Sequence, residues 1–192
     1  MSTQTSGLDG GRDVVIVTGP PGAGKTTVSR YLADAEPKSA HVESDYFFRF
    51  VRSGFIAPYK REAHVQNAQL MDIISDAVAG YAQGGYVAFW DGIVGPWFLE
   101  RIAGRLKETG LREHYLVLRP PREVTIERVR TRDRNLKLSG IETMFDQFCV
   151  LGPLEKHVMS AGGTTDELVT QCRSALEHGE LLLRTGHENN GL

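Results

Sequence analysis

The chain has 192 residues, of which 41% are hydrophobic and 24% charged, and this size and composition are typical of one globular domain with a buried core. Its 22 basic and 24 acidic side chains nearly balance, which argues against nucleic acid or an anionic membrane as the main partner. No apolar run approaches the roughly 20 residues of a membrane span, and the first residues, MSTQTSGLDGGRD, lack the apolar stretch of a secretory signal.

The polar residues 1–12 are expected to form a flexible tail. The first predicted strand, VVIVTG at 14–19, is rich in valine and stops at a glycine. It leads into PPGAGKTT (20–27), after which a helix is predicted. Four positions, Gly19, Gly24, Lys25 and Thr26, fit the pattern G-x-x-x-x-G-K-[ST] of a phosphate-binding loop.

The residue types of this loop suit a nucleoside triphosphate. Glycines let successive backbone N–H groups point inward at an anion, and the start of the following helix adds partial positive charge. Lys25 can reach the β- and γ-phosphates, and the Thr26 hydroxyl can ligate Mg²⁺. A glycine-rich turn that only caps a helix is the alternative, and the strand before and helix after the loop disfavour it. The predicted nucleotide-binding residues of the loop are Gly19, Pro20, Pro21, Gly22, Ala23, Gly24, Lys25, Thr26 and Thr27.

Carboxylates stand at the ends of the next two predicted strands. AHVESD (40–45) ends with Glu43 and Asp45, two residues apart and so on the same side of an extended segment, and VAFWDG (87–92) ends with Asp91 after an apolar run. Because ligands of open α/β sheets bind at the carboxyl ends of the strands, these groups are candidates for acceptor and metal binding. The structural alternatives are a helix N-cap at Asp45 and an Asp-Gly turn at Asp91.

The segments 46–70 and 90–98 follow these strand ends, and we expect them to fold over the phosphate loop and form the acceptor pocket. Their phenylalanines Phe47, Phe48, Phe50 and Phe55 are expected mostly to pack in the core or lid, whereas Trp97 and Phe98 are open between packing and acceptor binding. The aromatic content of the two segments indicates a partly apolar acceptor but does not identify it. An amphipathic helix is predicted over 64–82.

An arginine-rich segment follows the fourth predicted strand, HYLVLRP at 114–120. Arg128, Arg130, Arg132 and Arg134 recur at every second position, so they cannot all share one helical face. Phosphoryl transfer needs cations over the γ-phosphate. We therefore expect Arg130 and Arg134 to serve the nucleotide, with Arg128 or Arg132 solvated or ion-paired; a solvated helix end is the structural alternative.

KHVMSAG (156–162) is predicted as a fifth strand and 164–183 as a final helix, which starts at Thr164 or Thr165. Residues 186–192 are expected to form a second flexible tail. Strand alternates with helix about five times, which predicts a parallel sheet covered on both faces, in a single α/β domain over 13–185.

These features resemble the small phosphoryl-transferase branch of the P-loop NTPases, the nucleotide and shikimate kinase-like fold, and within it gluconate kinase-like and chloramphenicol phosphotransferase-like proteins. The resemblance covers roughly residues 13–183 and rests on GPPGAGKTT (19–27), ESD (43–45), the arginine-rich lid (128–134) and SAGGTTDELV (160–169). It implies a three-layer fold with a five-stranded parallel sheet in the order 2-3-1-4-5, and transfer of the ATP γ-phosphate to a small-molecule hydroxyl.

By the same resemblance, Asp45 matches the carboxylate that faces the acceptor hydroxyl, and Glu43 stands where many members have a metal-side aspartate. This departure leaves the Mg²⁺ ligand beside Thr26 open between Glu43 and Asp91. The predicted catalytic residues are Lys25, Asp45, Arg130 and Arg134.

The predicted function is that of a cytoplasmic, Mg²⁺-ATP-dependent kinase that phosphorylates a small hydroxylated molecule. We expect a monomer or homodimer that binds neither nucleic acid nor membrane. The cysteines, Cys149 and Cys172, match no zinc spacing and are expected to be reduced thiols. The alternative function is a nucleotide-dependent regulatory ATPase, or switch, without a small-molecule acceptor of its own.

Overall fold

The computed structural model describes residues 7–132, 138–160 and 163–183, and its centre is a five-stranded sheet. The strands lie in the order β2-β3-β1-β4-β5, and each of the four ladders between them is parallel. This order confirms the one that the resemblance implies. The strands are β1 (Asp13–Thr18), β2 (Ser39–Glu43), β3 (Val87–Asp91), β4 (Arg112–Leu118) and β5 (Val158–Met159).

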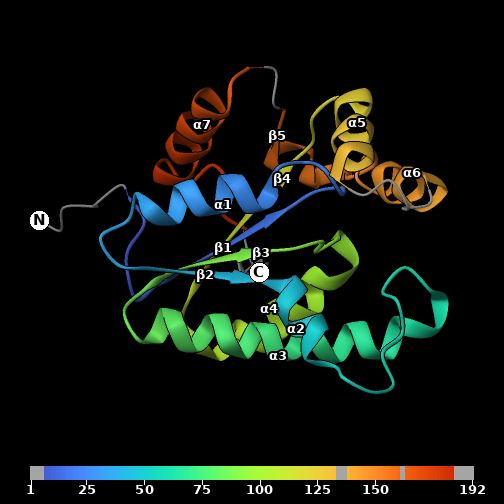
Figure 1. Cartoon of the computed structure of the whole chain (residues 1–192). Coiled ribbons are helices and arrows are strands. Elements are labelled where there is room, and N and C mark those ends of the chain that lie inside the picture. The colour runs from blue at the N-terminus through green and yellow to red at the C-terminus, as the bar shows by residue number, and fades with distance from the viewer. Residues whose placement is uncertain (1–6, 133–137, 161–162, 184–192) are drawn as a thin grey trace, which may run out of the picture.

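Helices cover both faces of the sheet (Figure 1). On one face lie α1 (Lys25–Asp34) and α7 (Thr165–Glu177), and on the other lie α3 (His64–Gln83) and α4 (Leu99–Leu106). Three further helices belong to the carboxyl end of the sheet, because α2 (Ser44–Phe50) follows β2, α5 (Arg122–Arg132) follows β4, and α6 (Leu138–Gln147) packs against α5. The fold is therefore the three-layer α/β fold of P-loop kinases.

The core divides at the sheet into two apolar clusters. On β1, Val14 and Ile16 pack toward α3 and α4, whereas Val15 and Val17 pack toward α1 and α7. All four are fully buried, which explains why a strand covered on both faces reads as an unbroken apolar run.

The C-terminal part differs from the sequence prediction in two places. β5 contains only two residues, because Gly152 begins a 3₁₀ segment that continues to His157 and so takes up the start of the predicted strand. The final helix starts as predicted, with Thr164 as N-cap in a capping box with Glu167. It ends at Glu177 and not near residue 183, because Gly179 turns the chain with a φ of 71°.

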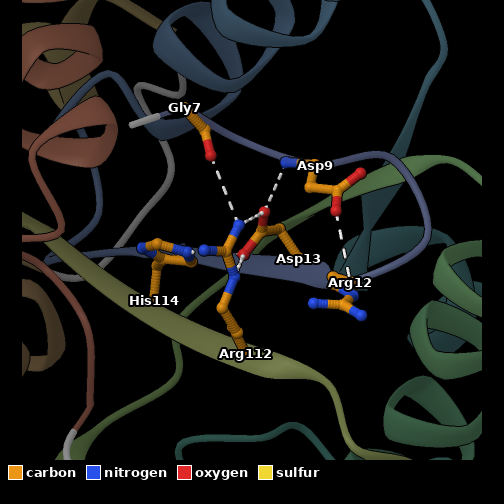
Figure 2. Close-up of polar contacts among 6 residues, drawn as sticks. All are labelled: Gly7, Asp9, Arg12, Asp13, Arg112 and His114. Atoms are coloured by element: carbon orange, nitrogen blue, oxygen red, sulfur yellow. Dashed lines mark hydrogen bonds and ion pairs between the residues drawn. The ribbon is translucent and has the colours of Figure 1, made fainter. Parts of the chain in front are cut away.

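At the amino ends of the strands, a buried carboxylate ties the segment before β1 to β4 (Figure 2). Asp13 accepts hydrogen bonds from the Arg112 guanidinium at 2.8 and 2.5 Å and from the backbone N–H of Asp9 at 2.6 Å, and its Oδ1 lies 2.8 Å from His114 Nε2. Burial alone would raise the pKa of Asp13, but the hydrogen bonds from His114, Arg112 and the Asp9 backbone outweigh it and hold the pKa below its usual value. Arg112 also donates to the carbonyl oxygen of Gly7, so residues 7–12 of the predicted tail contact the domain.

The expectations for the cysteines and for membrane spans can be compared with the described residues. Cys149 is exposed and Cys172 buried, and both are free thiols. None of the helices in the described part of the chain combines the length and the apolar character needed to span a membrane. The outer parts of the predicted tails, residues 1–6 and 186–192, lie outside the described residues.

Candidate phosphate and acceptor site

The loop between β1 and α1 has the backbone geometry of a phosphate cradle. Gly19, Gly22 and Gly24 have φ values of 141°, 80° and 94°, a region that side chains rarely enter. Two of them also lack room for a side chain, because a Cβ would lie 2.1 Å from the Leu118 carbonyl oxygen at Gly19 and 2.6 Å from the Thr125 carbonyl oxygen at Gly22. The glycines are therefore required by conformation and by space.

The first turn of α1 closes this loop. Lys25 is the first helical residue, and its Nζ donates hydrogen bonds to the carbonyl oxygens of Gly19 (3.1 Å) and Pro20 (3.0 Å). The ammonium group thus lies against the loop that is predicted to hold the phosphates. Thr26 is exposed beside it, and no side chain caps the helix at Gly24. The N–H groups of this turn are consequently available to an anion.

Helix α5 covers the loop from the other side. Thr125 and Val129 approach Gly22 closely, and Arg128 Nη1 donates to the Gly22 carbonyl oxygen at 3.5 Å. Sequence reasoning expected Arg128 or its neighbour Arg132 to be solvated or ion-paired, and it therefore missed this contact. In the structure residues 125, 128 and 129 share one face of α5, but the spacing of the arginines alone does not show that this face meets the loop.

Of the two arginines predicted to reach the nucleotide, the structure describes only one. Arg130 is exposed on α5, and no hydrogen bond or ion pair within the described residues involves its side chain. Arg134 lies outside the described residues. Their contact with the nucleotide remains a prediction.

The carboxylates at the strand ends lie next to one another and to the phosphate loop. Glu43 pairs in register with Asp91, which in turn pairs with Val17, two residues before Gly19. Glu43 is half-buried, whereas Asp91 is buried, with its Oδ2 3.5 Å from His41 Nε2. The two candidate metal ligands therefore stand side by side on adjacent strands.

The loop after β3 connects this edge to α2. The Gly92 N–H donates to the Val17 carbonyl oxygen at 3.2 Å, and the Trp90 indole N–H donates to the buried Ser44 hydroxyl at 2.8 Å. A Cβ at Gly92 would lie 2.1 Å from Ser44 Oγ. Ser44 is thus packed tightly against β3 at the point where α2 begins.

This packing fixes the place of Asp45. The N-cap of α2 is Glu43, so the alternative that Asp45 is a helix N-cap is wrong. Asp45 lies in the first turn of α2, where it is exposed and lines a cavity of about 940 Å³. It stands one residue beyond Ser44, which contacts Gly92 beside the end of β1.

The two segments from which the sequence predicts an acceptor pocket line this one cavity. The loop before α3 is held over it by Gln66, whose amide accepts from the Ile56 N–H at 2.9 Å and donates to the Ile56 carbonyl oxygen at 2.7 Å. Sequence reasoning missed the contribution of α6, which carries no motif. The lining residues from segments 46–70 and 90–98 include Phe48, Arg49, Phe55, Lys60, Arg61, His64, Ile93, Trp97 and Phe98; Met71 of α3 lines the cavity too, and the lining residues from α6 are Gly140, Thr143, Met144 and Gln147.

Comparison with known proteins agrees with this geometry. A family model described as the AAA domain matches residues 14–150, which include the phosphate loop, both strand-end carboxylates and α5. The chain belongs to the AAA domain family. No curated protein matches this AAA domain in sequence.

Solved structures similar to this AAA domain share its kinase-like P-loop fold. The tunicamycin resistance protein of Deinococcus radiodurans is 22% identical with a TM-score of 0.65, over 89% of this chain and 98% of that one. A gluconokinase of Sinorhizobium meliloti is 16% identical with a TM-score of 0.61, over 85% and 91%. The APS kinase of Mycobacterium tuberculosis, in complex with AMPPNP and APS, is 17% identical with a TM-score of 0.64, over 86% and 98%. At these identities the likeness establishes the fold alone.

Proposed function

We propose that this AAA domain is an ATP-dependent kinase that transfers the γ-phosphoryl group to a hydroxyl of a small molecule. The observation that carries the proposal is the position of Asp45, on the wall of a large cavity and close to the end of the strand that leads into the phosphate loop. A regulatory ATPase, the alternative, needs no acceptor cavity with a carboxylate in its wall. The kinase fold of the solved neighbours supports the same proposal.

In the proposed reaction, the backbone of residues 19–27 and Lys25 hold the phosphates of ATP. The acceptor oxygen attacks the γ-phosphorus in line, the bond to the oxygen between the β- and γ-phosphorus atoms breaks, and ADP leaves. Asp45 orients the acceptor hydroxyl and accepts its proton. Lys25 and Arg128, which both contact the phosphate loop, balance the charge of the transferring group.

The predicted metal fits the residues present. Hydroxyl and carboxylate oxygens are the ligands that Mg²⁺ prefers, and Mg²⁺ takes few protein ligands besides substrate phosphates and water. Glu43 and Asp91 pair in register on adjacent strands, and Asp91 pairs with Val17 just before the phosphate loop, so carboxylate oxygens are present beside it. Thr26, with Asp91 or Glu43, would hold Mg²⁺, which when bound helps to neutralise the phosphates.

Turnover of ATP tests the kinase proposal. ADP release should rise when a suitable member of a panel of sugars, nucleosides and hydroxylated antibiotics is added, and the phosphorylated product should appear in the mass spectrum. Asp45→Asn should bind AMPPNP like the parent protein but lose about 10²–10⁴-fold in transfer. The matched control is Asp34→Asn, at an exposed aspartate of α1 outside the cavity. Full transfer by Asp45→Asn would refute the assigned role of Asp45, and slow ATP hydrolysis that no acceptor stimulates would favour the switch.

The metal ligand can be assigned by the same assay. If Asp91 holds Mg²⁺, Asp91→Asn should raise the Mg²⁺ concentration needed for half-maximal turnover, while Glu43→Gln leaves it unchanged. The reverse result would assign the metal to Glu43, and no change in either variant would refute both assignments.

A further inference from the structure

The acceptor cavity carries three cations that have no carboxylate partner in the part of the chain that the structure describes. Arg49, Lys60 and Arg61 line it, and within the described residues no ion pair or side-chain hydrogen bond involves any of the three. Arg49 makes one ring contact, at 5.6 Å from the centre of Tyr46. Among the described residues of the cavity wall, Asp45 is the only acidic one. The cavity is therefore positively charged around a single carboxylate.

Many arginines outside the cavity are paired with a carboxylate. Seven of them, outside the cavity, have a carboxylate within ion-pair distance, at 3.8 Å in the longest pair and at 2.5–2.8 Å in the others. These seven are Arg12, Arg101, Arg105, Arg112, Arg119, Arg122 and Arg173. Arg30, Arg52, Arg128 and Arg130 also lack an ion pair within the described residues and lie outside the cavity. What distinguishes the cavity, among the residues that the structure describes, is that three cations without an ion pair gather around a single carboxylate in its wall.

The rest of the wall is apolar and partly aromatic. Phe48, Met71 and Phe98 form its inner part, and Phe55 and Trp97 expose 48% and 50% of their surface. Large aromatic side chains that line a cavity and remain half exposed offer a flat apolar surface to a ligand. The volume of about 940 Å³ lies near the upper end of the range of roughly 300–1,000 Å³ for small-molecule pockets.

We propose that the acceptor is an amphipathic hydroxy acid. It would have a flat apolar body, a hydroxyl directed at Asp45 and an anionic group, carboxylate or phosphate, held by Arg61 and Lys60. This inference rests on the kinase function proposed above and names its substrate class. A sugar acid satisfies the cations but leaves the aromatic wall in water, and a neutral apolar alcohol covers the wall but leaves the positive field uncompensated.

Binding can be measured without catalysis, because Trp97 lines the cavity while the other tryptophan of the chain, Trp90, is fully buried. The fluorescence of the AMPPNP-loaded protein is titrated with 4-(hydroxymethyl)benzoate, its methyl ester, 4-(hydroxymethyl)phenyl phosphate and gluconate. We expect at least one aromatic anion to bind about tenfold or more tightly than both the ester and gluconate, since a hydrogen bond to a charged group is worth about one to two orders of magnitude in affinity. Comparison of the affinities for the benzoate and the phenyl phosphate shows whether the site prefers a carboxylate or a phosphate.

Substitution tests the assigned cations. Arg61→Gln should weaken binding of the aromatic anion about tenfold and leave the ester unchanged. Arg52→Gln is the matched control, because Arg52 is an exposed arginine nearby that does not line the cavity. Equal binding of acid and ester, or equal losses in the two variants, would overturn the proposed substrate class.

The outcomes also separate this inference from the kinase function. An aromatic anion that binds with the expected preference but is never phosphorylated supports the ligand class and refutes the kinase. A neutral polyol that is phosphorylated, while neither aromatic anion binds, supports the kinase and refutes the ligand class.

Discussion

Gly92 should be a sensitive position for the geometry of the acceptor side. A methyl group there would lie 2.1 Å from Ser44 Oγ and 2.8 Å from Ser44 Cβ, far inside van der Waals contact. Ser44 is buried and receives the Trp90 indole hydrogen bond, so it cannot move without a shift of α2 or loss of that bond. Gly92→Ala therefore forces the start of α2, and with it Asp45, away from β3.

Overpacking of this kind costs about 1–3 kcal/mol in the free energy of unfolding. For a domain of this size the melting temperature should fall by roughly 2–12 °C. The matched control is Gly104→Ala in α4, where no atom lies within 4 Å of the added Cβ and φ is not positive. Because alanine is the better helix former, the control should gain about 0.5–1 kcal/mol.

Urea unfolding of both variants, followed by tryptophan fluorescence, measures these changes. The steric cause is tested by the double variant Gly92→Ala/Ser44→Gly, which removes both clashing atoms. Its destabilisation should be at least about 1 kcal/mol smaller than the sum of the two single changes. Additive costs, or a Gly92→Ala variant as stable as the parent protein, would refute the argument from the Ser44 contact.

The phosphate side of the site could be predicted closely from the sequence, because its chemistry is local. Gly19, Gly24, Lys25 and Thr26 are contiguous or nearly so, and the strand and helix that flank them are unbroken apolar and helical patterns. The sheet order came from the resemblance, and the local signals of the strands fixed only their number and approximate bounds. The length of β5 was overestimated because Lys156 and His157, the start of the predicted strand, belong to a 3₁₀ segment in the structure.

The acceptor side depends on contacts between distant segments, which a single sequence does not display. Ser44 meets Trp90 across 46 positions, and Arg128 meets Gly22 across 106. The arginines recur at every second position from 128 to 134, so their spacing alone does not show which of them faces the loop. That choice depends on how α5 docks against Gly22.

Three further perturbations test separate parts of the structure. Arg128→Ala should lower the kcat of ATP turnover about tenfold or more, because its charge lies against the phosphate loop; Arg130→Ala is the comparison, and equal, small effects would favour a solvated helix end. Gln66→Ala removes both amide bonds to the Ile56 backbone, so hydrogen exchange at the Ile56 amide should become about tenfold faster; unchanged exchange would show that other contacts hold the loop. The last prediction concerns pH and follows from the depressed pKa of the buried Asp13. A carboxyl whose pKa is lower in the folded than in the unfolded state stabilises the fold above its unfolded pKa of about 3.9, and this contribution is lost as the pH falls through the lower, folded-state pKa. Asp13→Asn should therefore lower the free energy of unfolding by on the order of 3 kcal/mol at pH 7, as expected when a buried ion pair loses one partner. The difference in the free energy of unfolding between the variant and the parent protein should then become smaller as the pH falls below about 4. Urea unfolding at a series of pH values measures both curves, and curves that stay parallel down to pH 3 would show that Asp13 is not held ionised by its partners.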